Sequence, residues 1–470
     1  MQILHVSAEC YPYAKVGGLG DVVGALPKYL QQAGHNARVV IPMYRTKFLY
    51  DNEWETVHKG NFQLHDWNVS YTIIKEATDK LGFELYGVDI FGLLDREQVY
   101  SYNDDAERFL AFSVAVADWV NSLPALPDIV HVHDHHTALV PFIMQHCNAY
   151  YRLKDVPTVL TIHNAQYQGW MDWEKGKYLP AWDSWKWGLL DWNKTINPLA
   201  CGIKCADRVT TVSPGYLEEI MYQANGLEQL FASEAQKCSG IINGIDTKLW
   251  DPETDPFLEH HFSVKTSETG KQKIKEELCT EFQLDAARPL AVFIGRLVGE
   301  KAADILPQAI AQSVFECGGN ISFLILGSGE PQVEQELSQL TSQFAGYYNA
   351  RIAYNEALSH RMYAGADFLL MPSRVEPCGL NQLYAMRYGT MPVVRSTGGL
   401  KDTVVDIGDG GYGIRFNNAT VSDVVYSVTR CVELYKDKET FYQKRVQMMN
   451  LDFSWEFSAK KYIALYEDLK

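Results

Sequence analysis

Short apolar runs alternate with longer amphipathic segments along most of the chain. The runs have the length of buried strands, and the segments between them carry the spacing of helices. This alternation predicts an α/β protein whose parallel sheets are covered by helices on both faces. The predicted strands are residues 3–6, 37–41, 128–132, 156–162, 208–212, 290–294, 321–326, 350–354, 368–371 and 391–394. The clearest predicted helices are residues 21–33, 105–123 and 455–469.

Two stretches interrupt this pattern. Residues 54–90 alternate apolar and polar positions as hairpin strands do, so we place them at a sheet edge. Near residues 241–246 the pattern restarts after a turn at Asn243-Gly244. We therefore expect a domain boundary there.

The length of 470 residues is sufficient for two or three domains. We expect two doubly wound, Rossmann-like domains over residues 1–240 and 241–455. We also expect a final helix over residues 456–470 that crosses back to the first domain. In such sheets, ligands bind at the carboxyl ends of the strands.

Composition narrows the classes of function. Lysine and arginine number 42 against 58 aspartates and glutamates, a net charge of -16, which argues against nucleic-acid or anionic-membrane binding. A local basic cleft is still allowed, because the charge is a sum over the molecule. The nine cysteines form no Cys-x-x-Cys pair, which favours free thiols in a reducing cytoplasm. The first residues lack the basic start of a signal peptide, and no apolar stretch reaches the length of a membrane span.

The stretch from Ser373 to Val404 carries the strongest chemical signal. A strand over 391–394 leads into Gly398-Gly399, and Asp402 and Thr403 follow in what reads as a first helical turn. Backbone N–H groups at such a turn can hold a phosphate, and Glu376 could hold a sugar hydroxyl. The alternative is that the glycine pair only makes a tight connection.

Arg296 and Lys301 follow the strand over 290–294, at the predicted start of a helix. Two cations beside a helix N-terminus would suit a diphosphate and would stabilise charge on a leaving group. The alternative is a pair of surface cations in ordinary ion pairs.

Three other features leave alternatives open. Gly17-Gly18-Leu19-Gly20 suggests a dinucleotide loop, but it departs from G-x-G-x-x-G, so hydride transfer has little support. His131, His133, His135 and His136 suggest a metal site, but His133 and His135 alternate around a strand end, which is poor spacing for zinc. We expect His133 to His136 to shape a polar pocket with Asp134 rather than to bind metal. Six tryptophans could stack on sugar rings or equally fill a core: Trp170, Trp173, Trp182, Trp185, Trp187 and Trp192.

Several motifs together resemble those of bacterial glycogen synthases and plant starch synthases. They are Lys15-Val16-Gly17-Gly18-Leu19, Thr161-Ile162-His163-Asn164 with Tyr167-Gln168-Gly169, Val212-Ser213-Pro214, Asn243-Gly244-Ile245-Asp246 with Trp250-Asp251-Pro252, Glu376-Pro377-Cys378-Gly379-Leu380, and Ser396-Thr397-Gly398-Gly399-Leu400 with Asp402-Thr403-Val404. The matches extend from residue 3 to about residue 457, nearly the whole chain.

The resemblance implies the GT-B fold, in which two Rossmann-like lobes face each other across a cleft. It implies transfer of glucose from ADP-glucose to the non-reducing end of an α-1,4-glucan, with retention at the anomeric carbon and without a metal or other cofactor. The partners would be ADP-glucose and glycogen or a maltooligosaccharide.

The resemblance also implies roles for single residues. The catalytic group would be Glu376, Arg296, Lys301, Asp134 and His163. The substrate-binding group would be Lys15 and Gly18 at the donor phosphates, Thr397, Gly399 and Leu400 at the diphosphate, Asn243 at the sugar and Tyr354 near adenine. Glu376 would bind hydroxyls of the transferred glucose. Departure of ADP would leave a cationic sugar, and the leaving phosphate oxygen would take the proton of the attacking hydroxyl, so no separate protein base is required.

Three positions depart from the family pattern. Glu300 and Ala302 stand where the family has glutamine and glycine, and His135 replaces an aromatic residue. Tyr384 stands where many other retaining transferases carry a second glutamate, which the glycogen synthases also lack at this position. The alternatives are a retaining transferase that uses UDP-glucose or another acceptor, and a catalytically weak paralogue that binds glucan.

Overall fold

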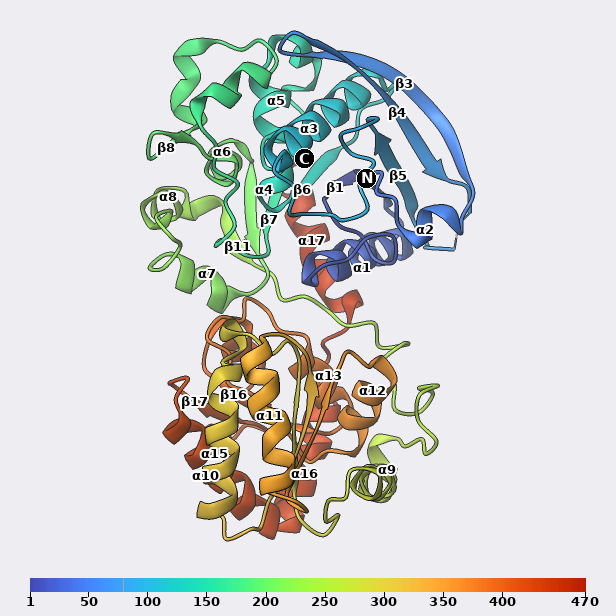
Figure 1. Ribbon diagram of the computed structural model, residues 1–470. Coiled ribbons are helices and arrows are strands. Elements are labelled where there is room, and N and C mark those ends of the chain that lie inside the picture. Colours follow the sequence, from blue (N-terminus) through green and yellow to red (C-terminus); the bar gives the residue numbers. More distant parts are fainter. Residues whose placement is uncertain (79) are drawn as a thin grey trace. The chain divides into compact units, whose positions relative to one another are not determined.

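The computed structural model describes residues 1–78 and 80–470, which divide into two compact units (Figure 1). Unit 1 is made of Met1–Val212, Leu217–Ile241 and Trp455–Lys470. Unit 2 is made of Ser213–Tyr216 and Ile242–Ser454. The second run of unit 1 ends at Ile241, one residue beyond the expected boundary at residue 240, and the C-terminal segment from Trp455 is part of unit 1.

Unit 1 is built on a nine-stranded sheet with the order β11-β10-β7-β6-β1-β2-β5-β4-β3. The strands from β11 to β5 are parallel, whereas β4 is antiparallel to both β5 and β3. The predicted hairpin therefore does lie at the edge. The bounds are β1 Gln2–Val6, β2 Asn36–Pro42, β3 Trp54–Leu64, β4 Trp67–Glu76, β5 Glu84–Asp89, β6 Ile129–His133, β7 Thr158–Ile162, β10 Arg208–Thr211 and β11 Cys238–Gly240. A small separate hairpin joins β8 Asp191–Trp192 and β9 Thr195–Ile196.

The helices of unit 1 pack on both faces of this sheet (Figure 1). On one face, α1 and α17 share a core with β1, β6 and β7. The helix α17 arrives from the far end of the sequence, and Tyr462 and Tyr466 on it are fully buried. The bounds are α1 Gly18–Gln32, α2 Lys47–Tyr50, α3 Asp105–Ser122, α4 Asp134–Thr137, α5 Val140–His146, α6 Pro198–Cys205, α8 Glu228–Ser233 and α17 Trp455–Glu467. The helix α7, Pro214–Ile220, begins in unit 2 and continues in unit 1.

Unit 2 is built on a six-stranded sheet with the order β14-β13-β12-β15-β16-β17, and all its strand pairs are parallel. This is the doubly wound order, because the chain first moves outward from β12 to β14 and then restarts beside β12 with β15. The bounds are β12 Leu290–Ile294, β13 Ser322–Gly327, β14 Tyr348–Ile352, β15 Phe368–Met371, β16 Met391–Arg395 and β17 Ile414–Phe416. Unit 1 repeats the reversal between β1 and β6.

Alternation along the strands of unit 2 assigns its helices to opposite faces. Ala291 and Phe293 on β12 belong to one core, which also contains the buried residues of α10, α11 and α15. Leu290 and Val292 belong to a second core with α9 and α12. Successive side chains of a strand point to opposite faces, so runs that are apolar throughout suit a sheet covered on both sides. The bounds are α9 Ser267–Glu281, α10 Leu306–Glu316, α11 Pro331–Gln343, α12 Glu356–Gly365, α13 Asn381–Arg387, α14 Gly398–Thr403, α15 Val421–Lys436 and α16 Lys438–Met449.

Four predicted boundaries are wrong in ways that affect the site. The helix α1 begins at Gly18 rather than Asp21, so part of the glycine run is helical. The helix α14 begins at Gly398, which places Asp402 and Thr403 in its last turn. Two short 3-10 turns follow β12, so Lys301 does not start a helix and α10 begins at Leu306. The strand β14 ends at Ile352, before Tyr354.

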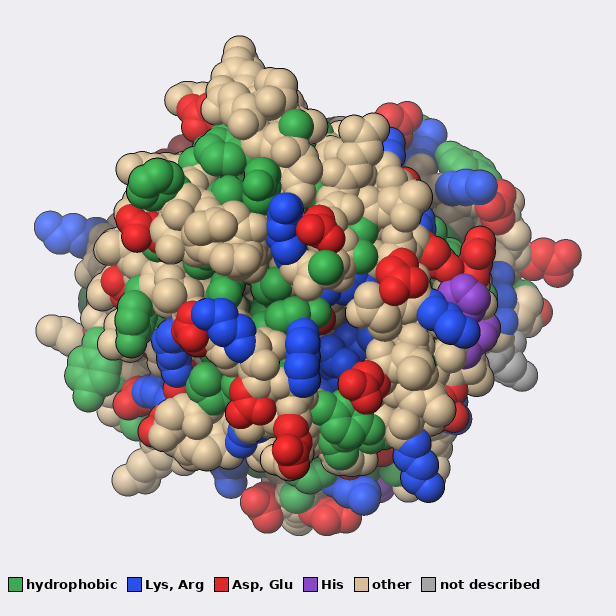
Figure 2. Space-filling model, turned by 90° about the horizontal axis from the view of Figure 1, so that it is seen from below, with side chains coloured by type: hydrophobic (Ala, Val, Ile, Leu, Met, Phe, Trp, Pro, Cys, Tyr) green, Lys and Arg blue, Asp and Glu red, His purple; other side chains and the backbone are tan. Residues whose placement is uncertain are grey.

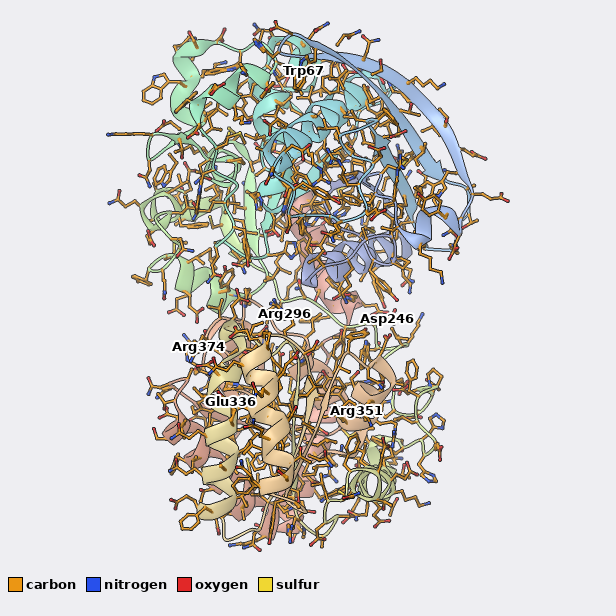
Figure 3. The ribbon with its side chains drawn as sticks, viewed as in Figure 1. Trp67, Asp246, Arg296, Glu336, Arg351 and Arg374 are labelled. Carbon is orange, nitrogen blue, oxygen red and sulfur yellow. The ribbon has the colours of Figure 1, made fainter. Side chains whose placement is uncertain are left out.

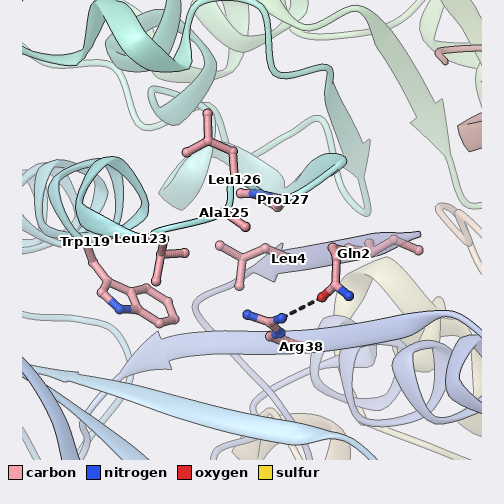
Figure 4. A pocket seen from close by; sticks show the side chains of 9 residues that line it. Gln2, Leu4, Arg38, Trp119, Leu123, Ala125, Leu126 and Pro127 are labelled. Carbon is pink, nitrogen blue, oxygen red and sulfur yellow. Dashed lines mark hydrogen bonds between the residues drawn. The ribbon is translucent and has the colours of Figure 1, made fainter.

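The surface and the amino ends of the strands of unit 1 carry none of the predicted motifs as a cluster. Acidic and basic side chains are interspersed on the face shown in Figure 2. A cavity of about 200 Å³ lies at the amino ends of β1 and β2, where Arg38 donates to Gln2 at 2.5 Å (Figure 4). Its walls are mostly apolar and include none of the predicted site residues.

Among residues 1–78 and 80–470, no helix has the length and apolarity needed to cross a bilayer. All nine cysteines are free thiols.

Candidate active site

In unit 1, the predicted residues gather where β1 and β6 end. Glu9 follows β1 and is 3% exposed. One of its oxygens accepts hydrogen bonds from the amides of Val16 (2.6 Å) and Gly17 (3.0 Å), and the other accepts from the Tyr100 hydroxyl at 2.6 Å. Glu9 thus ties the glycine-rich loop to the end of the strand, because a buried carboxylate needs such donors.

Lys15 and Gly18 lie on this tied loop and at the start of α1. The Lys15 ammonium pairs with Asp21 at 2.7 Å, and its side chain is 43% exposed. A Cβ added at Gly18 would meet no atom within 4 Å, so space is not what requires glycine there. The ammonium is accessible to an anion that competes with Asp21.

Asp134 stands directly after β6 in a strained conformation. Its φ of 56° is in the left-handed region, where an ordinary side chain costs energy. Its carboxylate accepts a hydrogen bond from the His163 amide at 2.7 Å. Burial raises the pKa of Asp134 from 3.8 to about 7, while the amides of His163 and Asn164 act in the opposite direction. Asp134 and His163, predicted for one sugar site, are therefore neighbours in unit 1.

The histidines around Asp134 are neutral. Burial lowers the pKa of His163 to about 3 and that of His135 to about 4. A group that could hold a metal ion is formed by His5, His131 and His133, whose ligand atoms lie within 4.8 Å of one another. All three are fully buried, and their ring nitrogens are engaged in hydrogen bonds with neighbouring side chains, save Nε2 of His5.

In unit 2, the centre of the predicted site is an ion pair across the reversal of strand order. Lys301 follows β12, Glu376 follows β15, and their Nζ and Oε2 atoms are 2.5 Å apart. The Ser373 hydroxyl donates to the same carboxylate oxygen at 2.8 Å. Glu376 is 7% exposed, so this pairing offsets the cost of burying its charge. The doubly wound order brings these residues together, as the topological rule for ligand sites requires.

Two arginines lie at the same edge of unit 2 (Figure 3). The Arg296 guanidinium is 67% exposed and pairs with Glu300 at 3.2 Å. Arg374 forms a bidentate pair with Asp304 at 2.6 and 2.8 Å, and its guanidinium holds the pKa of that carboxyl below its ordinary value. Of these two arginines, only Arg296 was predicted to bind phosphate, and its guanidinium is paired with the carboxylate of Glu300.

Ala302 has a left-handed conformation, with φ 53° and ψ 36°, between the two 3-10 turns that follow β12. This explains why glycine suits the position, since only glycine adopts that region without strain. The methyl group is completely buried, so it also adds to the core of unit 2.

The glycine pair after β16 is required by close backbone approach. A Cβ at Gly398 would lie 2.1 Å from the Glu376 carbonyl oxygen, and one at Gly399 would lie 2.1 Å from that of Cys378. The amide of Gly399 donates to the Glu376 carbonyl at 3.1 Å, and the amide of Leu400 donates to the Thr397 carbonyl at 3.0 Å. We expected free N–H groups at this turn, which is wrong for these two amides. One donates to a carbonyl in the loop of Glu376, and the other donates to a carbonyl within the turn.

The remaining predicted residues are divided. Asn243 is buried beside the loop of Glu376, its backbone amide faces the Cys378 thiol, and its Oδ1 has no hydrogen-bond partner among the described residues. Thr397 and Leu400 are buried, which leaves their backbones rather than their side chains for a ligand. Tyr354 is 85% exposed on the loop after β14, two strands away from β12 in the sheet.

Three residues that shape the site were not predicted as site residues from the sequence. Glu9 was noticeable as an acid directly after an apolar strand, and Ser373 as a hydroxyl three residues before Glu376. No local signal marks Arg374, whose partner Asp304 is seventy residues away along the chain.

The tryptophans do not fill the core: Trp170, Trp185 and Trp187 are exposed, and the other three are half-buried.

Comparison with known proteins decides the family. A sequence profile described as the starch synthase catalytic domain matches residues 2–233, and one described as glycosyl transferases group 1 matches residues 288–433. A glycogen synthase of Flavobacterium johnsoniae is 53% identical over 466 residues, which cover 99% of this chain and 98% of that protein. This chain belongs to the glycogen and starch synthase family. The glycogen synthase of Streptococcus sanguinis is 37% identical over the whole length of both chains.

Solved structures agree with this family and define its fold. The catalytic domain of starch synthase IV from Arabidopsis thaliana, bound to ADP and acarbose, has a TM-score of 0.88 and 33% identity, and the match covers 100% of this chain and 99% of that one. A sucrose-phosphate synthase from Thermosynechococcus elongatus, at 16% identity and a TM-score of 0.64, shares the fold alone. This member of the glycogen and starch synthase family therefore has the GT-B glycosyltransferase fold, as its motifs predict.

Proposed function

We propose that this chain transfers glucose from ADP-glucose to the non-reducing end of an α-1,4-glucan, with retention of configuration at the anomeric carbon. The single observation that carries the proposal is the Lys301–Glu376 pair at the strand-order reversal of unit 2. The related starch synthase, whose structure contains ADP and acarbose, supports the choice of nucleotide and of glucan. The cytoplasm is the compartment that we infer for such a reaction.

We assign the nucleotide diphosphate to Arg296 and Lys301. When a diphosphate binds, it competes with Glu376 for the Lys301 ammonium and with Glu300 for the Arg296 guanidinium. Cations on the diphosphate stabilise the charge that grows on the leaving group as the bond to the sugar breaks. Lys15, with its accessible ammonium, adds a further cation from unit 1.

We assign Glu376 and Asn243 to the transferred glucose. The family motifs give Asp134 and His163 the same role. Once the diphosphate binds the Lys301 ammonium, the Glu376 carboxylate is free to accept hydrogen bonds from sugar hydroxyls. The unpartnered Oδ1 of Asn243 is a second acceptor. The attacking glucan hydroxyl gives its proton to the leaving phosphate oxygen on the same face, which retains the configuration without a separate protein base.

The other roles follow the family pattern. Gly18 lies at the start of α1 close to Lys15, where a backbone amide can meet phosphate. The turn of Thr397, Gly399 and Leu400 would meet the diphosphate only if its amides exchange their present carbonyl partners. Tyr354 would contact adenine from its exposed loop.

Initial rates of glucose transfer to glycogen, measured with ADP-glucose and with UDP-glucose in EDTA, test this proposal. We expect turnover that prefers ADP-glucose and does not need a divalent metal. Preference for UDP-glucose would move the protein to a sister activity. Glucan binding without turnover of either donor would favour a binding paralogue, with the Arg296–Glu300 pair as its cause.

A further inference from the structure

A row of buried imidazoles crosses the sheet of unit 1. His5 lies on β1, His131 and His133 lie on β6, and each is 0% exposed. His5 is in register with His131, and His133 follows two positions later, so all three point to the face that α17 covers. Three polar rings in a core cost free energy unless they are hydrogen-bonded.

The contacts form a relay that ends at the proposed sugar site. Nδ1 of His5 is 3.2 Å from Nε2 of His133, and Nδ1 of His133 is 3.2 Å from Nε2 of His163. His131 is outside this relay, because its nitrogens bond the Tyr466 hydroxyl at 2.7 Å and the Thr161 hydroxyl at 2.6 Å. The second ring nitrogen of His163, Nδ1, takes no part in the relay.

Each ring of the relay carries one N–H. Burial lowers the pKa of His5 and of His163 to about 3, and that of His133 falls well below its ordinary value, so all are neutral. A neutral imidazole has one donor and one acceptor nitrogen. The protons in the relay can therefore point in only two ways, all toward His163 or all toward His5.

The far end of the relay distinguishes the two directions. Nε2 of His5 is buried and has no hydrogen-bond partner among the described residues. If the protons point toward His5, this nitrogen must carry an N–H with no acceptor. If they point toward His163, the nitrogen carries only a lone pair. Orphaned buried N–H groups are rarer in native proteins than under-satisfied acceptors, so the second arrangement is favoured.

We propose that His5 and His133 are positioning residues that fix His163 as the tautomer with its hydrogen on Nδ1. In this arrangement His163 presents a permanent N–H donor to an acceptor oxygen of the hexose, a hydroxyl or a ring oxygen. The proposal deepens the assignment of His163 to the sugar and rests on the proposed function for that role. The tautomer itself is independent of the reaction.

The same cluster could be interpreted as a metal site of His5, His131 and His133. His131 would have to give up its bond to Tyr466 or to Thr161 in order to ligate an ion. The hydrogen-bonded pairs satisfy these rings without an ion, so we favour the relay.

Two-bond hydrogen–nitrogen correlation spectra of the full chain, with ¹⁵N-labelled histidine, test the tautomer directly. Substitutions of single histidines assign the signals. We expect protonated Nδ1 and bare Nε2 in His5, His133 and His163. A proton on Nε2 of His163 would overturn the proposal, as would changes in the His5 and His131 signals when stoichiometric Zn²⁺ is added. The result does not depend on turnover, so it is separate from the test of the proposed function.

A matched pair of variants tests the direction of the relay. In His5→Asn, the side-chain amide keeps an N–H donor for His133. Aspartate has the same shape as asparagine, but when ionised it offers only an acceptor, so His5→Asp reverses the direction of both hydrogen bonds of the relay. We expect the His163 proton to move to Nε2 in His5→Asp alone, with kcat at least about tenfold below that of His5→Asn and little change in KM for the donor. Matching circular dichroism spectra show that both variants fold. An unmoved proton in folded His5→Asp, at a pH where the introduced carboxyl is ionised, would contradict the relay.

Discussion

Lys301 is the residue whose removal should affect catalysis most specifically. Lys301→Ala removes the cation that we assign to the leaving diphosphate, so we expect turnover of ADP-glucose to fall more than tenfold, on the order of 100-fold. It also leaves the buried Glu376 carboxylate without its partner at 2.5 Å. Initial rates and thermal melting separate the two effects. Lys273→Ala, an exposed lysine on α9, is the control, and equal rates in the two variants would refute the assignment.

Asp134 should make stability depend on pH. Its pKa is about 7 in the folded chain against an ordinary 3.8, so the folded state binds more protons between these values. The free energy of unfolding therefore falls as pH rises from about 4 to 7, by at most about 4 kcal/mol. Asp134→Asn, which keeps the acceptor oxygen and tolerates positive φ, removes this dependence.

Chemical denaturation at pH 5 and pH 8 measures the effect. We expect the free energy of unfolding of Asp134→Asn to exceed that of the wild type by more at pH 8 than at pH 5. Asp66→Asn, at a carboxylate that is 83% exposed, controls for the loss of a charge. Parallel behaviour of the wild type and Asp134→Asn would show that the buried carboxyl does not titrate as described.

Residues that belong to local motifs could be predicted, and those defined by distant partners could not. Asp134 with His163, and Lys301 with Glu376, were predicted as members of one site and are in contact within their units. Glu300 was identified as a departure from the family pattern, and the structure shows that it pairs with Arg296. The role of Glu9 depends on amides that only the folded loop brings to it, so its type and position alone could not reveal it.

At the scale of elements, the loop of Glu376 depends on the glycines that open α14. Gly399→Ala would place a Cβ 2.1 Å from the Cys378 carbonyl oxygen, so the backbone must move and the bond from its amide to Glu376 is lost. We expect a loss of about 2–4 kcal/mol in unfolding free energy, with reduced turnover. Denaturant titration measures the loss.

Gly188→Ala is the matched control, since a Cβ there meets nothing within 4 Å. A Gly399→Ala chain as stable and as active as Gly188→Ala would mean that the two loops need not approach so closely.

The existence of most elements could be predicted, but their ends could not. Apolar runs predicted ten strands, and each of them agrees with an observed strand to within about two residues, which is the usual uncertainty of such boundaries. The short edge strands β11 and β17 were not predicted. The start of α14 at Gly398 and the two 3-10 turns before α10 depend on backbone contacts with other loops. Such contacts leave no periodic pattern in the sequence, so the expected helix at Lys301 was wrong.

At the scale of the whole molecule, α17 completes the core of unit 1 from the other end of the chain. Trp455, Ala459, Tyr462 and Tyr466 on α17 are nearly or fully buried. A chain that stops at Ser454 would expose their partners on α1 and the buried imidazoles, so we expect unit 1 to lose several kcal/mol of stability.

Differential scanning calorimetry of the chain truncated after Ser454 measures this loss. We expect a lower melting temperature for unit 1, and the transition of unit 2 serves as the internal control. If an added peptide of residues 455–470 restores the melting temperature of unit 1, the result would support the packing of α17 in this core. An unchanged melting profile would contradict it.

The doubly wound architecture of both units could be predicted, because alternating strands and helices leave few topologies. The strand order, with reversals beside β1 and β12, could be inferred only by analogy, since no local pattern records which strands pair. The family comparison agrees with the architecture over the full chain.

The proposed reaction is the addition of glucose from ADP-glucose to an α-1,4-glucan with retention. Its most direct test is an NMR spectrum of the wild-type protein with ADP-glucose, ¹³C-labelled at the anomeric carbon, and a maltooligosaccharide. We expect the label to move into a new α-1,4 linkage at the non-reducing end as ADP accumulates. Label in a β linkage, or only in free glucose, would contradict it.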